Sequence, residues 1–372
     1  MGNICLLKYD MTDRSGGERV TSLLSQALSR QFCVHVVSIT GRGEPTYFPL
    51  DPQVHYAAFL PGHSPIRSTT VAGSRQLRAY LKQNQIDVCL SIGGNVNLFL
   101  YLATRGTKIR TVFCEHMNLV TANRMDRANR LLRWLASRFA DRIITLTQQD
   151  REAYLNTYHL PPERVDYIYN WVDDRLLSSS GSCDLDAHRM ITVGRFDYLK
   201  GMDYLVEAAK IVLERHPDWQ WDVYGDGPDL EAVRQQVQEA GLEDRLHLMG
   251  ARSDIYERYG RYSLYVMTSR SEGLPMVLLE AKSQGLPVVS FDCRTGPREI
   301  LSDGVDGFLV PPYDTGLLAE KICLLMEDDA LRRAFSSHAR DCLPRFEKEK
   351  IVRKWCALLE ELSGMEGKGE GS

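Results

Sequence analysis

The chain alternates short apolar runs with amphipathic stretches, and this alternation restricts the possible folds more than any other feature. Strand-like runs in the first half cover Ile4–Leu7, Cys33–Ile39, Asp87–Ile92, Arg110–Cys114, Arg142–Leu146 and Val165–Tyr169. Helical patterns lie between them: one begins near Gly16, and the others cover Arg75–Asn84, Leu98–Thr104, Arg130–Ala140 and Gln148–Tyr158. Such a pattern predicts parallel strands with helices on both faces of the sheet.

The pattern restarts after a small, polar run at Ser178–Asp186. The strands expected beyond it are Arg189–Val193, Trp219–Tyr224, Leu246–Leu248, Leu264–Thr268, Pro287–Phe291 and Phe308–Val310, and the helices are Met202–Glu214, Asp229–Ala240 and Leu317–Met326. A chain of 372 residues is too long for one typical core. We therefore predict an α/β fold of two doubly wound, Rossmann-like domains, residues 1–177 and 187–344, with a linker at 178–186 and a central cleft between them. The Gly-rich residues 363–372 are expected to form a disordered tail.

The charge and the cysteines exclude several classes of protein. A net charge of -4 gives no support for a nucleic-acid binder. The nine cysteines are scattered without a C-x-x-C pair, which favours a reduced, cytoplasmic setting over a disulfide scaffold or a zinc site. No apolar run approaches the ~20 residues of a spanning helix, and the N-terminus lacks a signal-peptide pattern. We expect a soluble or at most peripheral protein.

The segment Ser271–Glu280 joins an apolar strand to an apolar helix. Glu272 lies in the turn, Gly273 permits close approach to the backbone, and Pro275 suits a first helical turn. Glu280 follows about two turns later, a spacing that suits two ends of one elongated ligand better than one metal ion. Between them, the N–H groups of a helix N-terminus can hold phosphate. A nucleotide-sugar has this shape, and an ordinary strand-turn-helix with solvated carboxylates is the alternative.

The loop Gly194–Gly201 also follows a strand and opens a helix, and it contains Arg195 and Lys200. A guanidinium and an ammonium both suit phosphate oxygens. We interpret the two cations as partners of the same diphosphate, with solvated loop charges as the alternative.

Two further loops follow the next strands of this half. Gly225-Asp-Gly227 is predicted to be a tight turn that keeps bulk away from the ligand. The loop with Gly250 and Arg252 either meets a nucleobase or is a plain turn.

In the first half, two pairs of residues follow strands in the same way. Gly16 and Gly17 permit a phosphate or a sugar to approach the backbone, or simply make the loop flexible. Glu115 and His116 end the strand at Arg110–Cys114. His116 could polarise a sugar hydroxyl, although a histidine in this position is more often structural.

Together these pieces resemble the retaining glycosyltransferases of family four, the group-one family with the GT-B fold. The matching pieces are Gly16-Gly17, Glu115-His116, Gly194-Arg195, Lys200-Gly201, Gly225-Asp-Gly227, and Glu272 with Glu280 at the E-x7-E spacing. The run Asp292–Glu299 is similar to members that build bacterial surface polysaccharides. Trp171 stands where many members have glycine in an Asn-Gly-Val-Asp linker.

The resemblance implies a role for each matching position. Arg195 and Lys200 would bind the donor diphosphate and stabilise it as a leaving group. Glu272 would hold donor-sugar hydroxyls, Glu280 the ribose hydroxyls, and His116 a sugar hydroxyl near the reacting carbon. The remaining donor-binding positions are Gly16, Gly17, Arg252, Gly273, Leu274, Pro275 and Met276.

The resemblance also implies a metal-independent front-face substitution without a cofactor, in which the nucleotide-sugar is a substrate. Asp184-Leu-Asp186 is formally a D-x-D metal motif, but it lies in the linker, so we interpret it as solvated charge. The last helix, residues 345–362, would pack back onto the first domain, as is usual in this fold.

A basic stretch at residues 123–142 offers a clue to where the acceptor is located. It contains Arg124, Arg127, Arg130, Arg133, Arg138 and Arg142, interleaved with Leu131, Leu132, Trp134, Leu135 and Phe139. A basic amphipathic helix suits an anionic membrane that carries a lipid-linked acceptor. The preferred alternative buries Leu131, Leu135 and Phe139 and leaves the arginines in water.

The sequence therefore predicts an enzyme that moves a hexose or N-acetylhexosamine from a UDP-linked donor to a glycan of the cell surface. Capsule, exopolysaccharide or O-antigen would be the product. A UDP-sugar epimerase or phosphorylase of the same fold, and a catalytically silent nucleotide-sugar-binding protein, are the alternatives.

Overall fold

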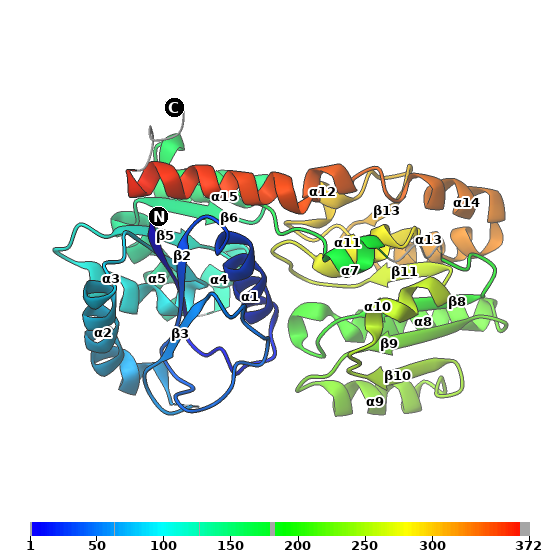
Figure 1. The fold of residues 1–372 in the computed structure, drawn as a ribbon. Coiled ribbons are helices and arrows are strands. Elements are labelled where there is room, and N and C mark those ends of the chain that lie inside the picture. The colour runs from blue at the N-terminus through cyan, green and yellow to red at the C-terminus, as the bar shows by residue number, and fades with distance from the viewer. Residues whose placement is uncertain (1, 63, 126, 179–182, 365–372) are drawn as a thin grey trace, which may run out of the picture. The chain divides into compact units, whose positions relative to one another are not determined.

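The computed structural model describes residues 2–62, 64–125, 127–178 and 183–364, which fold into two compact units (Figure 1). The first unit comprises residues 1–170 and 348–372, and the second comprises residues 171–347. Each unit has its own sheet and its own hydrophobic core. The predicted α/β class with two Rossmann-like domains is confirmed.

The first unit is built on a seven-stranded parallel sheet in the order β3-β2-β1-β4-β5-β6-β7. Its strands are β1 (Asn3–Lys8), β2 (Cys33–Ser38), β3 (His55–Ala58), β4 (Val88–Ile92), β5 (Arg110–Cys114), β6 (Arg142–Thr145) and β7 (Val165–Tyr167). Its helices are α1 (Gly16–Leu28), α2 (Ile66–Gln83), α3 (Asn97–Thr104), α4 (Leu119–Met125), α5 (Arg127–Phe139), α6 (Gln148–Tyr158) and α15 (Lys348–Ser363). The central strands are buried on both faces, which explains their continuous apolar runs.

The second unit repeats the design with six parallel strands in the order β10-β9-β8-β11-β12-β13. Its strands are β8 (Arg189–Val193), β9 (Gln220–Tyr224), β10 (Leu246–Gly250), β11 (Leu264–Met267), β12 (Val288–Phe291) and β13 (Gly307–Val310). Its helices are α7 (Asp174–Ser178), α8 (Met202–Arg215), α9 (Leu230–Glu239), α10 (Ile255–Arg258), α11 (Met276–Ser283), α12 (Pro297–Ile300), α13 (Thr315–Glu327) and α14 (Asp329–His338). Trp221 is fully buried in a core to which α8 and α13 contribute.

The strand order of each sheet reverses direction at one point, and this point positions the binding loops. The reversal lies between β1 and β4 in the first unit and between β8 and β11 in the second. In open parallel sheets, ligands bind beyond the carboxyl ends of the strands at such a switch point. The loops with Lys200 and Glu272 follow β8 and β11, so the fold brings these sequence-distant residues to one place.

The division of the chain differs from the predicted linker at 178–186. Residues 171–178 belong to the second unit, where the amide of Gln284 donates to the carbonyl of Leu176 at 3.0 Å. Cys183 and Asp184 also pack on this unit through their backbone N–H groups. Asp186 forms a 2.6 Å ion pair with Arg333 rather than only meeting solvent. Residues 179–182 lie outside the described residues.

The last helix, α15, belongs to the first unit, where it packs against α1 and β4 (Figure 1). It begins at Lys348, after a short 3-10 turn at Leu343–Phe346, rather than at residue 345. The predicted tail at 363–372 lies outside the described residues from 365 onward.

Two elements of the first unit had weak sequence signals. Strand β3 has four partly exposed residues at the sheet edge, so it shows no apolar run. Helix α2 begins at Ile66 rather than Arg75 because its first half is rich in threonine and serine. Gly73 allows close packing there, since a Cβ would come 3.0 Å from the Phe99 ring.

Candidate active site

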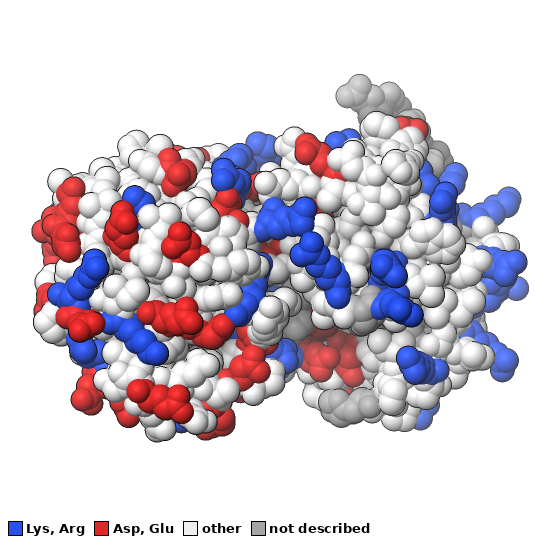
Figure 2. Space-filling model, turned by 180° about the vertical axis from the view of Figure 1, so that it is seen from behind, with Lys and Arg blue, Asp and Glu red and all other residues white. Residues whose placement is uncertain are grey.

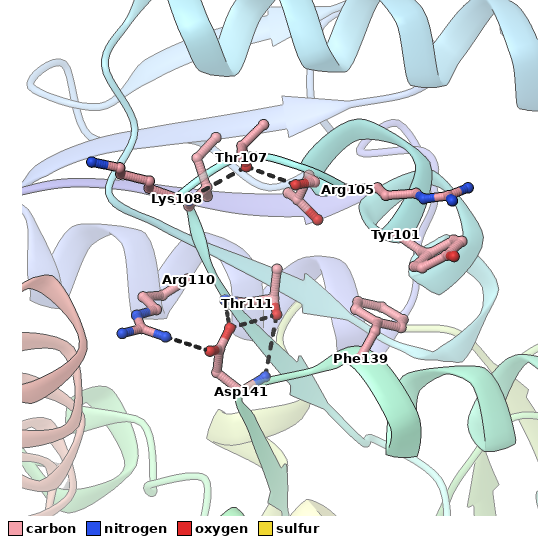
Figure 3. A pocket seen from close by; sticks show the side chains of 10 residues that line it. Tyr101, Arg105, Thr107, Lys108, Arg110, Thr111, Phe139 and Asp141 are labelled. Carbon is pink, nitrogen blue, oxygen red and sulfur yellow. Dashed lines mark hydrogen bonds and ion pairs between the residues drawn. The ribbon is translucent and has the colours of Figure 1, made fainter.

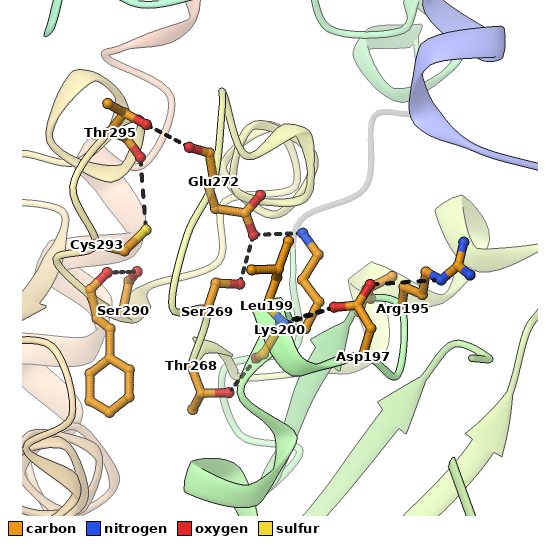
Figure 4. A network of polar contacts seen from close by, with 12 residues as sticks. Arg195, Asp197, Leu199, Lys200, Thr268, Ser269, Glu272, Ser290, Cys293 and Thr295 are labelled. Atoms are coloured by element: carbon orange, nitrogen blue, oxygen red, sulfur yellow. Dashed lines mark hydrogen bonds and ion pairs between the residues drawn. The ribbon is translucent and has the colours of Figure 1, made fainter. Parts of the chain in front are cut away.

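The candidate site in the second unit is centred on an ion pair between Lys200 and Glu272. The Lys200 ammonium donates to Glu272 Oε1 at 2.6 Å, and the Ser269 hydroxyl donates to the same oxygen at 2.6 Å (Figure 4). The lysine side chain is 26% exposed and the carboxylate 9%. Burial by itself would lower the pKa of Lys200, but the charge of Glu272 outweighs burial and raises this pKa. Lys200 therefore remains a cation at neutral pH, at the switch point where an anionic ligand is expected.

Asp197 organises the loop that carries the two predicted cations. Its carboxylate accepts from the backbone N–H groups of Leu199 (3.0 Å) and Lys200 (3.2 Å) and caps a 3-10 turn. The Arg195 side chain is 60% exposed, and its Nε lies 3.7 Å from Asp197. Figure 4 shows the Arg195 guanidinium directed away from Glu272. The structure thus joins Lys200 to Glu272 directly, whereas the Arg195 side chain contacts Asp197.

The turn before α11 is held by the loop that follows β12. The Thr295 hydroxyl donates to the Glu272 carbonyl at 2.5 Å. At Gly296, a Cβ would come 2.4 Å from the Pro275 ring, so the close contact requires glycine. Helix α11 begins at Met276 with Pro275 as its N-cap residue.

The expected backbone cradle is therefore smaller than the sequence analysis proposed. Pro275 has no N–H to offer. Gly273, Leu274 and Met276 retain N–H groups near the start of the helix, where the dipole favours an anion.

Glu280 occupies a different environment from Glu272. It lies within α11, nearly buried, and accepts from the hydroxyls of Tyr259 (2.9 Å) and Tyr256 (3.2 Å). A carboxylate with two tyrosine donors is fixed in orientation, which suits a group that must meet the two hydroxyls of a ribose. Its predicted role stays a prediction.

The glycines after β9 serve the packing of neighbouring loops. A Cβ at Gly225 would lie 1.8 Å from the carbonyl oxygen of Gly194, and one at Gly227 would lie 2.3 Å from that of Phe196. The close contact in the structure is thus between the loops after β8 and β9, and the predicted effect of these glycines on a ligand stays a prediction. Arg252 is exposed in the loop after β10.

In the first unit, Gly17 lies beside a lysine that the sequence analysis did not single out. A Cβ at Gly17 would come 2.7 Å from the Lys8 ammonium, whereas one at Gly16 would meet nothing within 4 Å. Lys8 forms a 2.7 Å ion pair with Glu18, and both side chains are almost fully buried. Gly17 therefore makes room for a cation at the start of α1.

The motif Glu115-His116 divides into a structural residue and a candidate functional one. Glu115 is buried and receives two hydrogen bonds from Arg133, at 2.5 and 3.0 Å, and one from Tyr154 at 2.7 Å. His116 is only partly covered. Burial and the nearby charge of Lys8 lower the pKa of His116 to about 4, against the opposing effect of Glu115. His116 is therefore a neutral imidazole at physiological pH, a state that can both donate and accept a hydrogen bond.

The basic stretch differs from the preferred alternative of the sequence analysis. The fully buried residues of α5 are Arg133, Ala136 and Ser137, because Glu115 draws the Arg133 guanidinium inward, and the partly buried Phe139 also packs against the core. Leu131 is 60% exposed and Trp134 is 45% exposed. The predicted burial of Leu131 and the predicted solvation of Arg133 are both wrong. The predicted packing of Phe139 on the core and the exposure of the other arginines of α4 and α5 are confirmed.

A pocket of about 450 Å³ lies in the first unit at the opposite ends of the strands (Figure 3). It is lined by the loop between α3 and β5 and by Phe139 and Asp141. Asp141 binds Arg110 at 2.9 Å and Thr111 at 2.9 Å, which ties this loop to the end of α5. None of the predicted site residues lines this pocket.

Three residues around the Lys200–Glu272 ion pair were not predicted from the sequence. They are Asp197, Ser269 and Arg270. Arg270 donates to the Tyr198 carbonyl at 2.8 Å and pairs with Asp203, so it braces the Lys200 loop from the β11 side. Arg270 and Ser269 directly follow the strand before Glu272, a position that could have identified them.

The two units define the class of protein. Paired Rossmann-like units form the GT-B fold, and the structure of HepE from Anabaena in complex with UDP-glucose has this arrangement. It matches 96% of this chain and 99% of its own with a TM-score of 0.79 and 20% sequence identity.

Sequence comparisons then identify the family. The model described as Glycosyltransferase Family 4 matches residues 14–176, and the model described as Glycosyl transferases group 1 matches residues 180–341. An uncharacterised glycosyltransferase of Haemophilus influenzae is 26% identical over 92% of this chain and 96% of its own. The amylovoran biosynthesis glycosyltransferase AmsD of Erwinia amylovora is 28% identical over 95% of this chain and 99% of its own. The chain belongs to the group 1 glycosyltransferases and is a transferase enzyme.

None of the helices in the described part of the chain combines the length and the apolarity needed to cross a membrane.

Proposed function

We propose that this glycosyltransferase moves a hexose or N-acetylhexosamine from a UDP-linked donor, with retention, to a growing cell-surface polysaccharide. The observation that carries the proposal is the Lys200–Glu272 ion pair beside the start of α11. It combines a cation for phosphate, a carboxylate for sugar hydroxyls and helix N–H groups within one loop cluster. The similarity to AmsD, described as acting in amylovoran biosynthesis, supports the polysaccharide as product.

In the proposed reaction, the bond between the anomeric carbon and the diphosphate oxygen breaks. The acceptor oxygen bonds to the same face of the carbon, and its proton passes to the departing phosphate oxygen. Lys200 and Arg195 stabilise the charge that develops on the diphosphate, with the α11 N-terminus as a third contribution. No cofactor takes part in this proposal, because the nucleotide-sugar supplies the leaving group.

A donor screen tests the proposal. The full chain is incubated with UDP-, GDP- and ADP-sugars and an acceptor extract, and nucleotide release is measured. Acceptor-dependent release of UDP supports the proposal, and anomer analysis of the product tests retention. Release of only GDP or ADP, or an inverted product, would contradict it. UDP-sugar turnover without an acceptor would instead indicate an epimerase.

The exposed face of α5 supports a lipid-linked acceptor at the cytoplasmic surface of a membrane. Arg127, Arg130, Leu131, Trp134 and Arg138 recur at helical spacing on the side opposite Arg133. The Arg138 guanidinium lies 5.9 Å from the centre of the Trp134 ring. The right-hand part of the surface in Figure 2 belongs to the first unit, and it carries many lysines and arginines and few acidic side chains. Such a face combines apolar insertion with attraction to anionic lipid.

Vesicle sedimentation tests this part of the proposal. The wild-type chain is expected to pellet with anionic vesicles and to remain in solution with neutral ones. The variant Arg127→Gln/Arg130→Gln should bind roughly 10-fold more weakly or worse, because each basic side chain near the surface contributes ~1 kcal/mol. Trp134→Ser should also weaken binding, whereas Val71→Ser, an exposed apolar position on α2, should not. Failure of the wild-type chain to pellet with anionic vesicles would remove the membrane from the proposal.

A further inference from the structure

Three potential metal ligands meet at the edge of the first sheet, away from the candidate active site. One sulfur of Cys33 and one nitrogen each of His35 and His55 all lie within 4.8 Å of one another. Cys33 and His55 are the first residues of β2 and β3, so the group lies at the amino ends of these strands. The candidate catalytic residues follow the carboxyl ends of strands.

Backbone register holds the three residues in place. Cys33 and His35 are two residues apart on β2 and project from the same face. His35 and His55 are direct partners in the pairing of β2 with β3. The Cα positions are therefore set by the sheet and do not depend on a flexible loop.

The distance between the Cys33 sulfur and the nearest His35 nitrogen fits tetrahedral coordination of one metal ion. Cys33 Sγ lies 3.6 Å from His35 Nε2. A zinc ion ~2.3 Å from sulfur and ~2.0–2.1 Å from nitrogen holds such atoms ~3.5 Å apart. The rings of His35 and His55 are stacked with centroids 4.7 Å apart, and the exposed His55 has room to turn its nitrogen toward the same point.

The surroundings of His35 match those of a metal-binding histidine. His35 is 4% exposed, and its Nδ1 lies 2.9 Å from the Tyr80 hydroxyl. A hydrogen bond at the second ring nitrogen fixes the tautomer and aims the first nitrogen at the metal.

We propose that Cys33, His35 and His55 bind one zinc ion, which clips the edge strand β3 to β2. One thiolate and two imidazoles favour zinc over magnesium or calcium, which prefer oxygen ligands. The exposed side of His55 leaves the fourth coordination position to water. Because β3 is short and pairs on one side only, a metal bond between the strands stabilises the part of the sheet with fewest other contacts.

Cobalt titration of the full chain tests the proposal. The protein is freed of metal with a chelator, kept reduced and titrated with Co²⁺. One equivalent should produce a thiolate-to-cobalt charge-transfer band and the visible spectrum of a tetrahedral site, and Zn²⁺ should abolish both. Zn²⁺ should also raise Tm, and above its Kd the increase should follow the logarithm of the free Zn²⁺ concentration, since a ligand that binds only the folded state stabilises it.

Variants at the less buried ligands keep the test independent of folding. Cys33→Ser should lose the charge-transfer band, and His55→Ala should bind Co²⁺ at least ~10-fold more weakly. Tyr80→Phe should weaken binding ~10–100-fold while all three ligands remain. His338→Ala, an exposed histidine on α14, is the matched control and should bind as the wild type does. The absence of a charge-transfer band in the wild type, or a band that persists in Cys33→Ser, would overturn the proposal.

Discussion

The cluster around Glu115 in the first unit and the cluster around Lys200 in the second unit use charge in opposite ways. In the first unit, Glu115 receives hydrogen bonds from Arg133 and Tyr154, and all three side chains are buried. In the second unit, Lys200 and Glu272 form one ion pair whose lysine remains 26% exposed. The first pair serves the fold, because its charges are satisfied within the core. The second pair can exchange its partner for a ligand, because solvent reaches it.

Removal of Arg133 should have the largest effect of the changes considered. It should lower the stability of the fold, because the Glu115 cluster is structural. Arg133→Met leaves the Glu115 carboxylate buried without its cation, which should cost about 3–5 kcal/mol of unfolding free energy. Urea unfolding of the full chain measures the change. Arg138→Met, an exposed arginine on the same helix, is the control and should change stability by less than about 0.5 kcal/mol. If Arg133→Met were as stable as Arg138→Met, the Glu115 cluster would not have the structural role that distinguishes it from the Lys200 cluster.

Removal of Lys200 should affect activity rather than stability. Lys200→Ala is expected to lower turnover roughly 100- to 1,000-fold, the loss typical of one preorganised group that stabilises transition-state charge. The turnover of Glu272→Ala should also fall steeply. The Tm of both variants should change little. Lys210→Ala, an exposed lysine on α8, provides the control. If Lys200→Ala and Glu272→Ala both kept full activity, the site assignment would be wrong.

The pH dependence of stability should report the neutral His116. Its pKa is about 4 in the folded chain against ~6.5 when unfolded. The unfolded chain therefore binds the proton first, so stability is complete above pH ~6.5 and declines as the pH falls toward 4. His116→Gln should reduce this decline by roughly 1–3 kcal/mol. The pKa of His35 is also lowered, so part of the loss of stability at low pH should remain in this variant. An unchanged decline in His116→Gln would place the neutral imidazole in doubt.

Chelation should have the smallest effect on transfer. Lys200 and Arg195 already supply the positive charge for the diphosphate, so EDTA is expected to change the transfer rate by less than about two-fold. Nucleotide release with and without EDTA measures this. Abolition of transfer would indicate a metal in the reaction, and a fall in Tm alone would instead reflect the proposed zinc ion at β3.

Much of the fold was predictable because the local signals agree with the tertiary structure. Strand β5 and helix α6 have the predicted bounds, since β5 is an almost continuously buried run and α6 is capped by Thr147 at its start and ends at the left-handed His159. Strand β3 and the first half of α2 were missed because edge exposure and β-branched residues hide the pattern. The boundary at 170/171 was also missed, since the polar run after it packs on the second unit through hydrogen bonds that no composition reveals.

The sequence by itself determined the two α/β repeats and the E-x7-E segment, because periodicity and spacing are local properties of the chain. It also placed Lys200 and Glu272 after strands, and therefore at the binding edge of a parallel sheet. Only the tertiary structure decided which charges meet. Among six similar arginines of the basic stretch, Arg133 is the one whose guanidinium meets Glu115, which follows β5 and lies 18 residues earlier in the chain. Cys33, His35 and His55 became a cluster only through the register of two strands, because hydrogen bonding between strands, and not sequence proximity, sets which side chains are neighbours.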